Sequence, residues 1–118
     1  MKENFKEVEI DDLVMIISIN KTYKDNLTSD GLYNITHASW KVGPERAKAV
    51  FAFATYKGIV KEVYKIHSWS QDVETNSKRW IFDGEIAEDP IRSKYFNKSV
   101  KHYRKWGSIN PIMYVNCK

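Results

Sequence analysis

The chain has 118 residues, of which 42% are hydrophobic and 14% aromatic, so it has the length of one domain and enough apolar side chains for a core. This composition excludes a disordered segment, and the lack of any run near about 18 apolar residues excludes a membrane-spanning helix and predicts no membrane partner. The charged N-terminus lacks the apolar run of a signal peptide, and the single cysteine, Cys117, has no disulfide partner within the chain, so we expect a cytoplasmic protein.

Acids and bases are unevenly divided along the chain. The net charge is +4, yet residues 1–89 contain all 15 acids and 12 of the 19 bases, which leaves seven bases and no acid in residues 90–118. Clustered lysine and arginine attract polyanions such as nucleic acids. This basic segment is therefore either a solvated face or an anion-binding surface, and the sequence leaves both interpretations open.

The first half of the chain predicts one strand and two short helices. A nearly continuous apolar run, rich in β-branched residues, predicts a buried strand over 13–19, and the polar stretch 22–31 predicts a surface loop. Apolar residues at helical spacing, after a Ser-Asp start signal, predict a helix over 32–39 with Trp40 at or past its end. A proline in the first helical turn predicts a second short helix over 44–48.

Two apolar runs in the middle of the chain predict strands over 51–56 and 58–66, which meet at Lys57 and Gly58. If Gly58 has a positive φ, the connection is a hairpin or a bulge. If it does not, the two runs form one long bent strand. The sequence alone does not choose between these geometries.

The last part of the chain predicts a polar loop over 70–77, a strand over 79–86 and a final strand over 112–115. Between these strands, a helix is expected from Pro90 to about Phe96, with Asp89 as its N-cap. No repeat or linker interrupts the chain, so we expect a single domain over 1–118. The fold class is α+β, with a small curved, mostly antiparallel sheet or an open barrel and two or three short helices.

Patterns typical of enzymes are weak. The five glycines are too scattered for a phosphate-binding loop, and the three histidines lie in different predicted elements, so we expect no cofactor and no metal site. These histidines are His37, His67 and His102. A carboxylate pair drawn from Glu62, Asp83 and Glu85 is a weaker enzymatic alternative, because surface carboxylates more often form salt bridges. His37 itself is expected to be a hydrogen-bonded structural residue.

Tryptophans beside basic residues are the feature that rises above this background. Proteins that stack a nucleobase combine flat aromatic faces with cations for the phosphates. Such neighbours occur at Trp40, at Trp80 and in the run 101–106. Trp69 and Trp80 are interpreted as core residues, because tryptophan is highly buried on average. The residues predicted to contact nucleic acid or a nucleotide are Trp40, Lys41, Arg46, Lys98, Lys101, His102, Arg104, Lys105, Trp106 and Asn110.

Two further stretches carry a resemblance to known domains. The run Gly-Ile-Val-Lys-Glu-Val-Tyr over 58–64 and the ending Asn-Pro-Ile through Tyr-Val-Asn over 110–116 resemble an uncharacterised domain of bacterial and phage proteins, sometimes joined to a GIY-YIG-type nuclease module. The resemblance extends from about Leu13 to Cys117 and implies work near DNA, with a nuclease as a candidate partner. His37 stands where an arginine is expected, and the nuclease module's own motifs are absent, so its catalytic activity does not carry over.

A more distant similarity concerns the fold. A bent Gly-Ile-Val-x-Glu-Val strand followed by Trp69 looks like the PUA-like group of small barrels, which includes readers of modified bases. The resemblance implies an open PUA-like barrel as the form of the sheet.

These observations lead to three hypotheses. The first is a non-enzymatic module that binds DNA, RNA or a modified nucleotide through the basic C-terminal segment and an aromatic face. The second is a small protein-interaction or structural domain, with its tryptophans in the core and the basic segment facing solvent or an acidic partner. The third is a metal-dependent nuclease that uses Glu62 or Asp83. The oligomeric state stays open.

Overall fold

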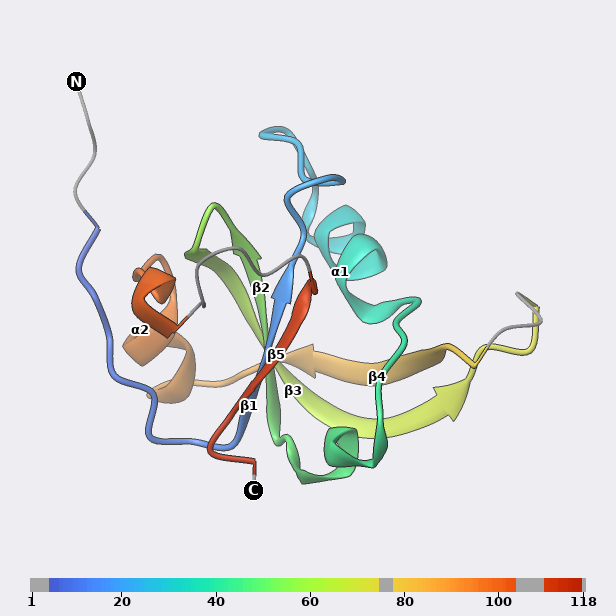
Figure 1. Ribbon diagram of the computed structural model, residues 1–118. Helices are drawn as coiled ribbons and strands as arrows, with labels where there is room; N and C mark the ends of the chain where they lie inside the picture. The colour runs from blue at the N-terminus through green and yellow to red at the C-terminus, as the bar shows by residue number, and fades with distance from the viewer. Residues whose placement is uncertain (1–4, 75–77, 104–109, 118) are drawn as a thin grey trace.

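The computed structural model describes residues 5–74, 78–103 and 110–117, which form one five-stranded mixed sheet in the order β4-β3-β2-β1-β5 (Figure 1). Strands β1 and β2 are parallel, and the other three neighbouring pairs are antiparallel. The strands are β1 (Val14–Ser18), β2 (Phe51–Tyr56), β3 (Ile59–Gln71), β4 (Trp80–Ile86) and β5 (Ile112–Val115). The predicted α+β class and mostly antiparallel sheet are confirmed; a PUA-like barrel is not.

Two α-helices and two 3₁₀ segments accompany the sheet: α1 (Ser29–His37), α2 (Ile91–Tyr95), η1 (Pro44–Lys48) and η2 (Lys101–Tyr103). Helices α1 and α2 lie on opposite sides of the strands (Figure 1). None of the helices within the described ranges is long and apolar enough to cross a membrane.

Each side of the sheet carries its own hydrophobic core. Val14 and Ile16 of β1 belong to the core under α2, whereas Met15 and Ile17 belong to the core under α1. Strand β1 is thus buried on both faces, which explains why its sequence is continuously apolar instead of alternating. We call the two sides of the sheet the α2 face and the α1 face.

The connection between β2 and β3 is a hairpin. Lys57 has a φ of 51° and Gly58 a φ of 78°, and Tyr56 pairs with Ile59 across this two-residue turn. Positive φ at both central positions is the backbone geometry of a tight hairpin turn, and it resolves the alternatives that the sequence left open. The register also shifts between Ala54 and Thr55, which marks a bulge near the start of β3.

Strand β3 is longer than its sequence predicts. It continues to Gln71, where the sequence predicts strand only to residue 66 and a loop from residue 70. Ser70 pairs with Ile81 and Gln71 with Trp80, so the first two residues of the expected loop belong to the sheet. The prediction was wrong there because main-chain pairing with β4 satisfies these residues, and an exposed strand accepts polar side chains. The β3–β4 hairpin extends well beyond the rest of the sheet (Figure 1).

Side chains from α1 cover the outer edge of β4. The Tyr33 hydroxyl accepts a hydrogen bond from Gly84 N at 3.1 Å and donates one to Phe82 O at 3.4 Å. The His37 Nδ1 atom lies 3.3 Å from the same carbonyl oxygen, so the expected structural role of His37 is confirmed. Covering an edge in this way protects its polar groups from pairing with another strand.

Both helix starts differ slightly from the prediction. Helix α1 begins at Ser29, within the predicted Ser-Asp start signal and three residues before the first apolar residue at helical spacing, so residues 29–31 of the expected loop are helical. The Thr28 hydroxyl caps the helix by accepting from Gly31 N at 3.0 Å. Helix α2 has its N-cap at Pro90, one residue later than predicted, and ends at Tyr95. The Asp89 carboxylate still satisfies an early main-chain N–H, since it accepts from Ser93 N at 3.0 Å.

Candidate nucleic-acid interface

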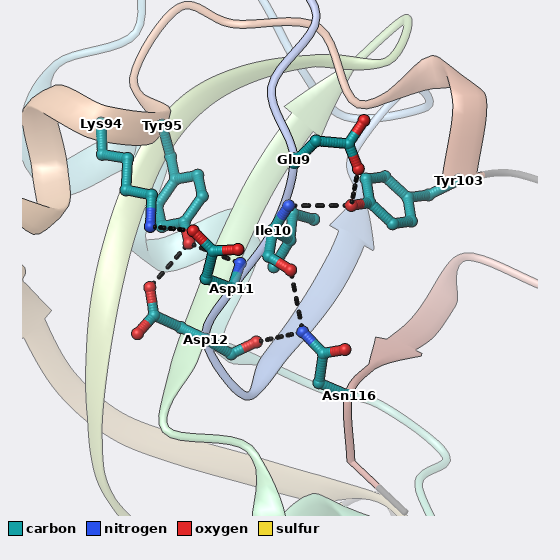
Figure 2. A network of polar contacts seen from close by, with 8 residues as sticks. All are labelled: Glu9, Ile10, Asp11, Asp12, Lys94, Tyr95, Tyr103 and Asn116. Atoms are coloured by element: carbon teal, nitrogen blue, oxygen red, sulfur yellow. Dashed lines mark hydrogen bonds and ion pairs between the residues drawn. The ribbon is translucent and has the colours of Figure 1, made fainter.

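The acidic N-terminal segment lies against the basic C-terminal segment. Asp11 Oδ2 is 2.7 Å from Lys94 Nζ, and the Tyr95 hydroxyl donates to Asp12 at 2.6 Å (Figure 2). Next to η2, the two ring nitrogens of His102 lie 3.7 Å from Glu7 and 3.6 Å from Glu9. The positive charge that the sequence concentrates in residues 90–118 is therefore partly neutralised in space.

Hydrogen bonds between side chains and the N-terminal main chain also hold these two segments together. Tyr103 and Tyr95 each accept a hydrogen bond from the N-terminal main chain, at Ile10 N (2.8 Å) and Asp11 N (3.1 Å). Asn116 donates from Nδ2 to the carbonyl oxygens of residues 10 and 12, at 2.9 and 3.0 Å (Figure 2). Burial is the main cause that raises the pKa of both tyrosines. This network joins three distant parts of the chain and holds the fold together.

On the α1 face, the predicted binding residues Trp40 and Arg46 both contact Trp80. Trp40 and Trp80 exchange two main-chain hydrogen bonds, at 3.0 and 2.8 Å, and the Trp40 indole donates to Thr36 O at 2.7 Å. The guanidinium carbon of Arg46 lies 3.5 Å from the centre of the Trp80 ring. Neighbouring Lys41 is exposed. Trp40 borders the α1-face core and its indole N–H is already bonded to Thr36 O, so this indole is held in place by the fold.

Trp69 and Trp80, which were predicted to be core residues, are both half-buried. Trp69 packs edge-on against Phe82 at 5.5 Å and is half-buried at the border of the α1-face core, so it is not the core residue that was predicted. Trp80 is half-buried rather than a core residue, because Arg46 covers one face of its ring. Stacking of a guanidinium on an indole occupies the surface that a base would need.

The remaining predicted residues lie apart from this group. Lys98 donates from Nζ to Ser93 O at 3.3 Å, and His102 faces Glu7 and Glu9, on the side of the sheet covered by α2. Asn110 accepts from Ile112 N at 2.9 Å, which is the turn-forming role that asparagine often has. The predicted residues Arg104, Lys105 and Trp106 lie outside the described ranges. The structure does not bring Trp40 together with Lys98 or His102.

A different set of aromatic and basic side chains gathers at the β2–β3 turn. The rings of Tyr23 and Tyr56 stack with their centres 4.5 Å apart and their planes 29° apart. The Lys57 ammonium lies 5.2 Å from the centre of the Tyr56 ring, and that of Lys61 lies 5.4 Å from the centre of the Tyr23 ring. With Lys101, which packs against Gly58, we call these residues the turn surface.

Three local features build the turn surface. The Asn20 side chain accepts from Lys57 N at 2.8 Å and holds the turn after β1 against the hairpin. Val100 N donates to Gly58 O at 2.8 Å, which places η2 beside the same turn. A β-carbon on Gly58 would lie 2.2 Å from Lys101 Cγ, so the glycine permits this close approach. Residues from three distant segments thus share one end of the sheet.

The turn surface keeps its positive charge. In residues 5–74, 78–103 and 110–117, no carboxylate forms an ion pair with Lys57, Lys61 or Lys101. The situation differs at Arg92, whose Nε atom lies 2.8 Å from the Glu62 carboxylate, and at Lys94, which is bound to Asp11. Exposed Lys21 and Lys24 flank Tyr23 in the sequence and add to the local charge.

Sequence reasoning found Lys101 but missed the other members of the turn surface. The available signal was the pair of Tyr-Lys neighbours at 23–24 and 56–57, which repeats the aromatic–basic pattern that was sought only at tryptophan. That the two pairs meet could not be deduced, because 33 residues separate Tyr23 from Tyr56.

The carboxylates considered for catalysis are not assembled into a site. Glu62 is buried and accepts from Arg92 Nε and from Val63 N, at 2.8 and 2.9 Å. Asp83 is exposed on β4. Within the part of the chain that the structure describes, no three His, Cys, Asp or Glu side chains come together as metal ligands. Cys117 is buried, and burial raises the pKa of its thiol, which disfavours the reactive thiolate.

Comparison with protein-family models, with curated proteins and with solved structures finds no match to this chain. The resemblance to a nuclease-linked bacterial and phage domain therefore stays a prediction, and the case for a function depends on the geometry described above.

Proposed function

We propose that the protein is a non-enzymatic nucleic-acid-binding module whose contact region is the turn surface. The observation that carries the proposal is the stacked pair Tyr23–Tyr56 with two lysine ammonium groups within 5.4 Å of the ring centres and no carboxylate paired to them in the described residues. Lysines supply affinity for phosphates, and aromatic rings supply stacking for bases.

The two kinds of group make separable contributions. Each lysine that neutralises a phosphate releases counterions, so the logarithm of the affinity falls with the logarithm of salt by about 0.7 to 0.9 per contact. A base stacked on an aromatic ring adds about 1–3 kcal/mol, which depends much less on salt. Three lysines therefore predict a salt slope of about −2 to −3.

The family resemblance supports the same class of ligand. PUA-like barrels include readers of modified bases, and a link to a nuclease module implies work near DNA. The PUA-like form of the sheet, a nuclease partner and a cytoplasmic location are carried here as parts of the proposal. A protein-interaction domain is the competing function, and the binding experiment distinguishes the two.

The test measures fluorescence anisotropy of a labelled 20-nucleotide oligonucleotide as protein is added, in 50 to 300 mM salt. We expect binding that weakens with salt, and a double variant Lys57→Gln/Lys61→Gln whose slope is smaller by roughly 1 per lysine. The matched control is Lys48→Gln/Lys65→Gln, which removes the same charge from two exposed lysines outside the turn surface and should keep the slope.

Two outcomes would contradict the proposal. No binding by the folded protein at 50 mM salt would favour the protein-interaction alternative. Equal loss in the two double variants would mean that net charge, and not the turn surface, determines affinity. Circular dichroism of every variant confirms that the sheet is intact.

A further inference from the structure

We infer that the nucleic acid accepted by the turn surface is single-stranded, with an unpaired base stacked on the Tyr23–Tyr56 pair. The inference rests on the proposed function and adds the class of substrate. It depends on two observations: the shape of the backbone at the turn, and the way the tyrosine rings are covered.

Among the described residues at the turn surface, no backbone element fits a duplex groove. A major groove admits an α-helix or a free two-stranded ribbon. Here the β2–β3 hairpin is embedded in the sheet, since Ser18 of β1 pairs with Thr55, one residue before Tyr56. The neighbouring η2 has three residues, and its Tyr103 is bonded to the N-terminal segment. A duplex would thus contact the lysines without presenting its base edges to a reading element.

The Tyr56 ring is covered by a group that can leave easily. Lys57 is exposed, and its ammonium lies 5.2 Å from the Tyr56 ring centre, at the outer limit of a cation–π contact. Such a contact at an exposed site is worth roughly a two- to fivefold change in an equilibrium. A base stacked on an aromatic ring contributes roughly five- to a hundredfold in affinity. If the Lys57 ammonium moves from the Tyr56 ring to a phosphate, it frees one face of that ring. A base that stacks on this face contributes more to affinity than the lost cation–π contact did.

The tryptophans do not offer the same opportunity. The Arg46 guanidinium carbon lies 3.5 Å from the Trp80 ring centre, and Arg46 also donates to Gly43 O at 2.9 Å. Trp40 is held through its indole N–H and its main chain. Only an unpaired base has a free face for a ring, because bases in a duplex are already stacked on their neighbours. The tyrosine pair with the displaceable Lys57 therefore fits a single strand.

The experiment compares three labelled probes by anisotropy at 50 mM salt: a 12-nucleotide oligo-dT, a 12-nucleotide oligo-rU and a 12-base-pair DNA duplex of mixed sequence. We expect at least one single strand to bind about tenfold or more tightly than the duplex. Tyr56→Leu should weaken single-strand binding about fivefold or more and leave the salt slope unchanged. Tyr56→Phe, which keeps the ring, should retain the affinity.

The outcomes separate this inference from the proposed function. If the duplex binds as tightly as both single strands, or if Tyr56→Leu binds as well as Tyr56→Phe, the single-strand inference is wrong, while binding through the lysines still stands. If none of the three probes binds to the folded protein, the proposed function itself fails. Thermal unfolding of each tyrosine variant shows whether a loss of binding reflects a loss of fold.

Discussion

Glycine at position 58 should be indispensable for the stability of the β2–β3 turn. Its φ is 78°, in the left-handed region that costs an L-amino acid about 1–2 kcal/mol. The β-carbon of Gly58→Ala would also lie 2.2 Å from Lys101 Cγ, an atom close to the main chain that cannot move away by rotating only the end of the side chain. Overpacking of this kind costs about 1–3 kcal/mol. We expect Gly58→Ala to lower the free energy of unfolding by about 2–5 kcal/mol.

A double-mutant cycle separates the two contributions. Urea unfolding, followed by tryptophan fluorescence, is measured for the wild type, Gly58→Ala, Lys101→Ala and the double variant. Lys101→Ala removes the crowded Cγ atom and leaves the Cβ atom 3.3 Å from the added carbon, so in that background Gly58→Ala should cost mainly the conformational term, about 1–2 kcal/mol. The same cost in both backgrounds would refute the steric argument, and a cost below about 0.5 kcal/mol in the wild type would refute the turn geometry.

Three further predictions concern tyrosine hydroxyl groups and Asn116. Tyr64→Phe removes a buried hydroxyl that has no hydrogen-bond partner among the described residues, so urea unfolding should show unchanged stability or a gain of up to about 1 kcal/mol. Tyr95→Phe, in contrast, loses the hydrogen bonds to the Asp12 carboxylate and from Asp11 N, and it should lower the free energy of unfolding by about 2 kcal/mol. Burial raises the pKa of Tyr64 and raises that of Tyr114 from 10.0 to about 12, so the unfolded chain releases these protons first. The stabilising contribution of these two protonated tyrosines is therefore fully present below pH 10. Between pH 10 and 12 the free energy of unfolding should fall by up to about 1.4 kcal/mol per pH unit for each tyrosine, and it should fall less steeply in Tyr114→Phe. A flat profile in denaturant titrations would contradict this expectation. Asn116 has a φ of 66° and donates two hydrogen bonds to the N-terminal segment. Asn116→Gly loses the hydrogen bonds and should cost about 1–2 kcal/mol, whereas Asn116→Ala also strains the backbone and should cost about 1 kcal/mol more. Equal costs in thermal unfolding would argue against backbone strain.

Local patterns predicted the elements of the fold better than their ends. The strand over 13–19 is recognisable because burial on both faces leaves no room for polar side chains, and β1 lies within that range. The end of β3 is not recognisable, since Ser70 and Gln71 are held by main-chain pairing with β4. Main-chain hydrogen bonds leave no trace in side-chain composition, so a polar strand looks like a loop. The hairpin at Gly58 needed a φ value that glycine permits and the sequence does not specify.

The location of free positive charge could not be predicted from its distribution along the chain. Val8 N donates to Ser99 O at 3.1 Å and Ser99 N to Lys6 O at 2.7 Å, so the N-terminal segment runs beside residues more than 90 positions away. That pairing brings Asp11 within 2.7 Å of Lys94. Lys57 and Lys61, in contrast, belong to the part of the chain with excess acid and have no carboxylate partner among the residues described. Charge summed over sequence segments therefore does not show which lysines lack a carboxylate partner in the fold.

Whether a cation already has a carboxylate partner also decides which aromatic–cation contact can bind a phosphate. The guanidinium carbon of Arg92 lies 4.1 Å from the Phe96 ring centre, but its Nε atom is 2.8 Å from Glu62, a buried carboxylate that would lose its partner. Leaving a buried carboxylate unpaired costs about 3–5 kcal/mol, more than a phosphate contact returns. At Lys57 a phosphate replaces only water and a ring contact at 5.2 Å. Binding should therefore concentrate where cations lack carboxylate partners, which among the described contacts selects the turn surface over α2.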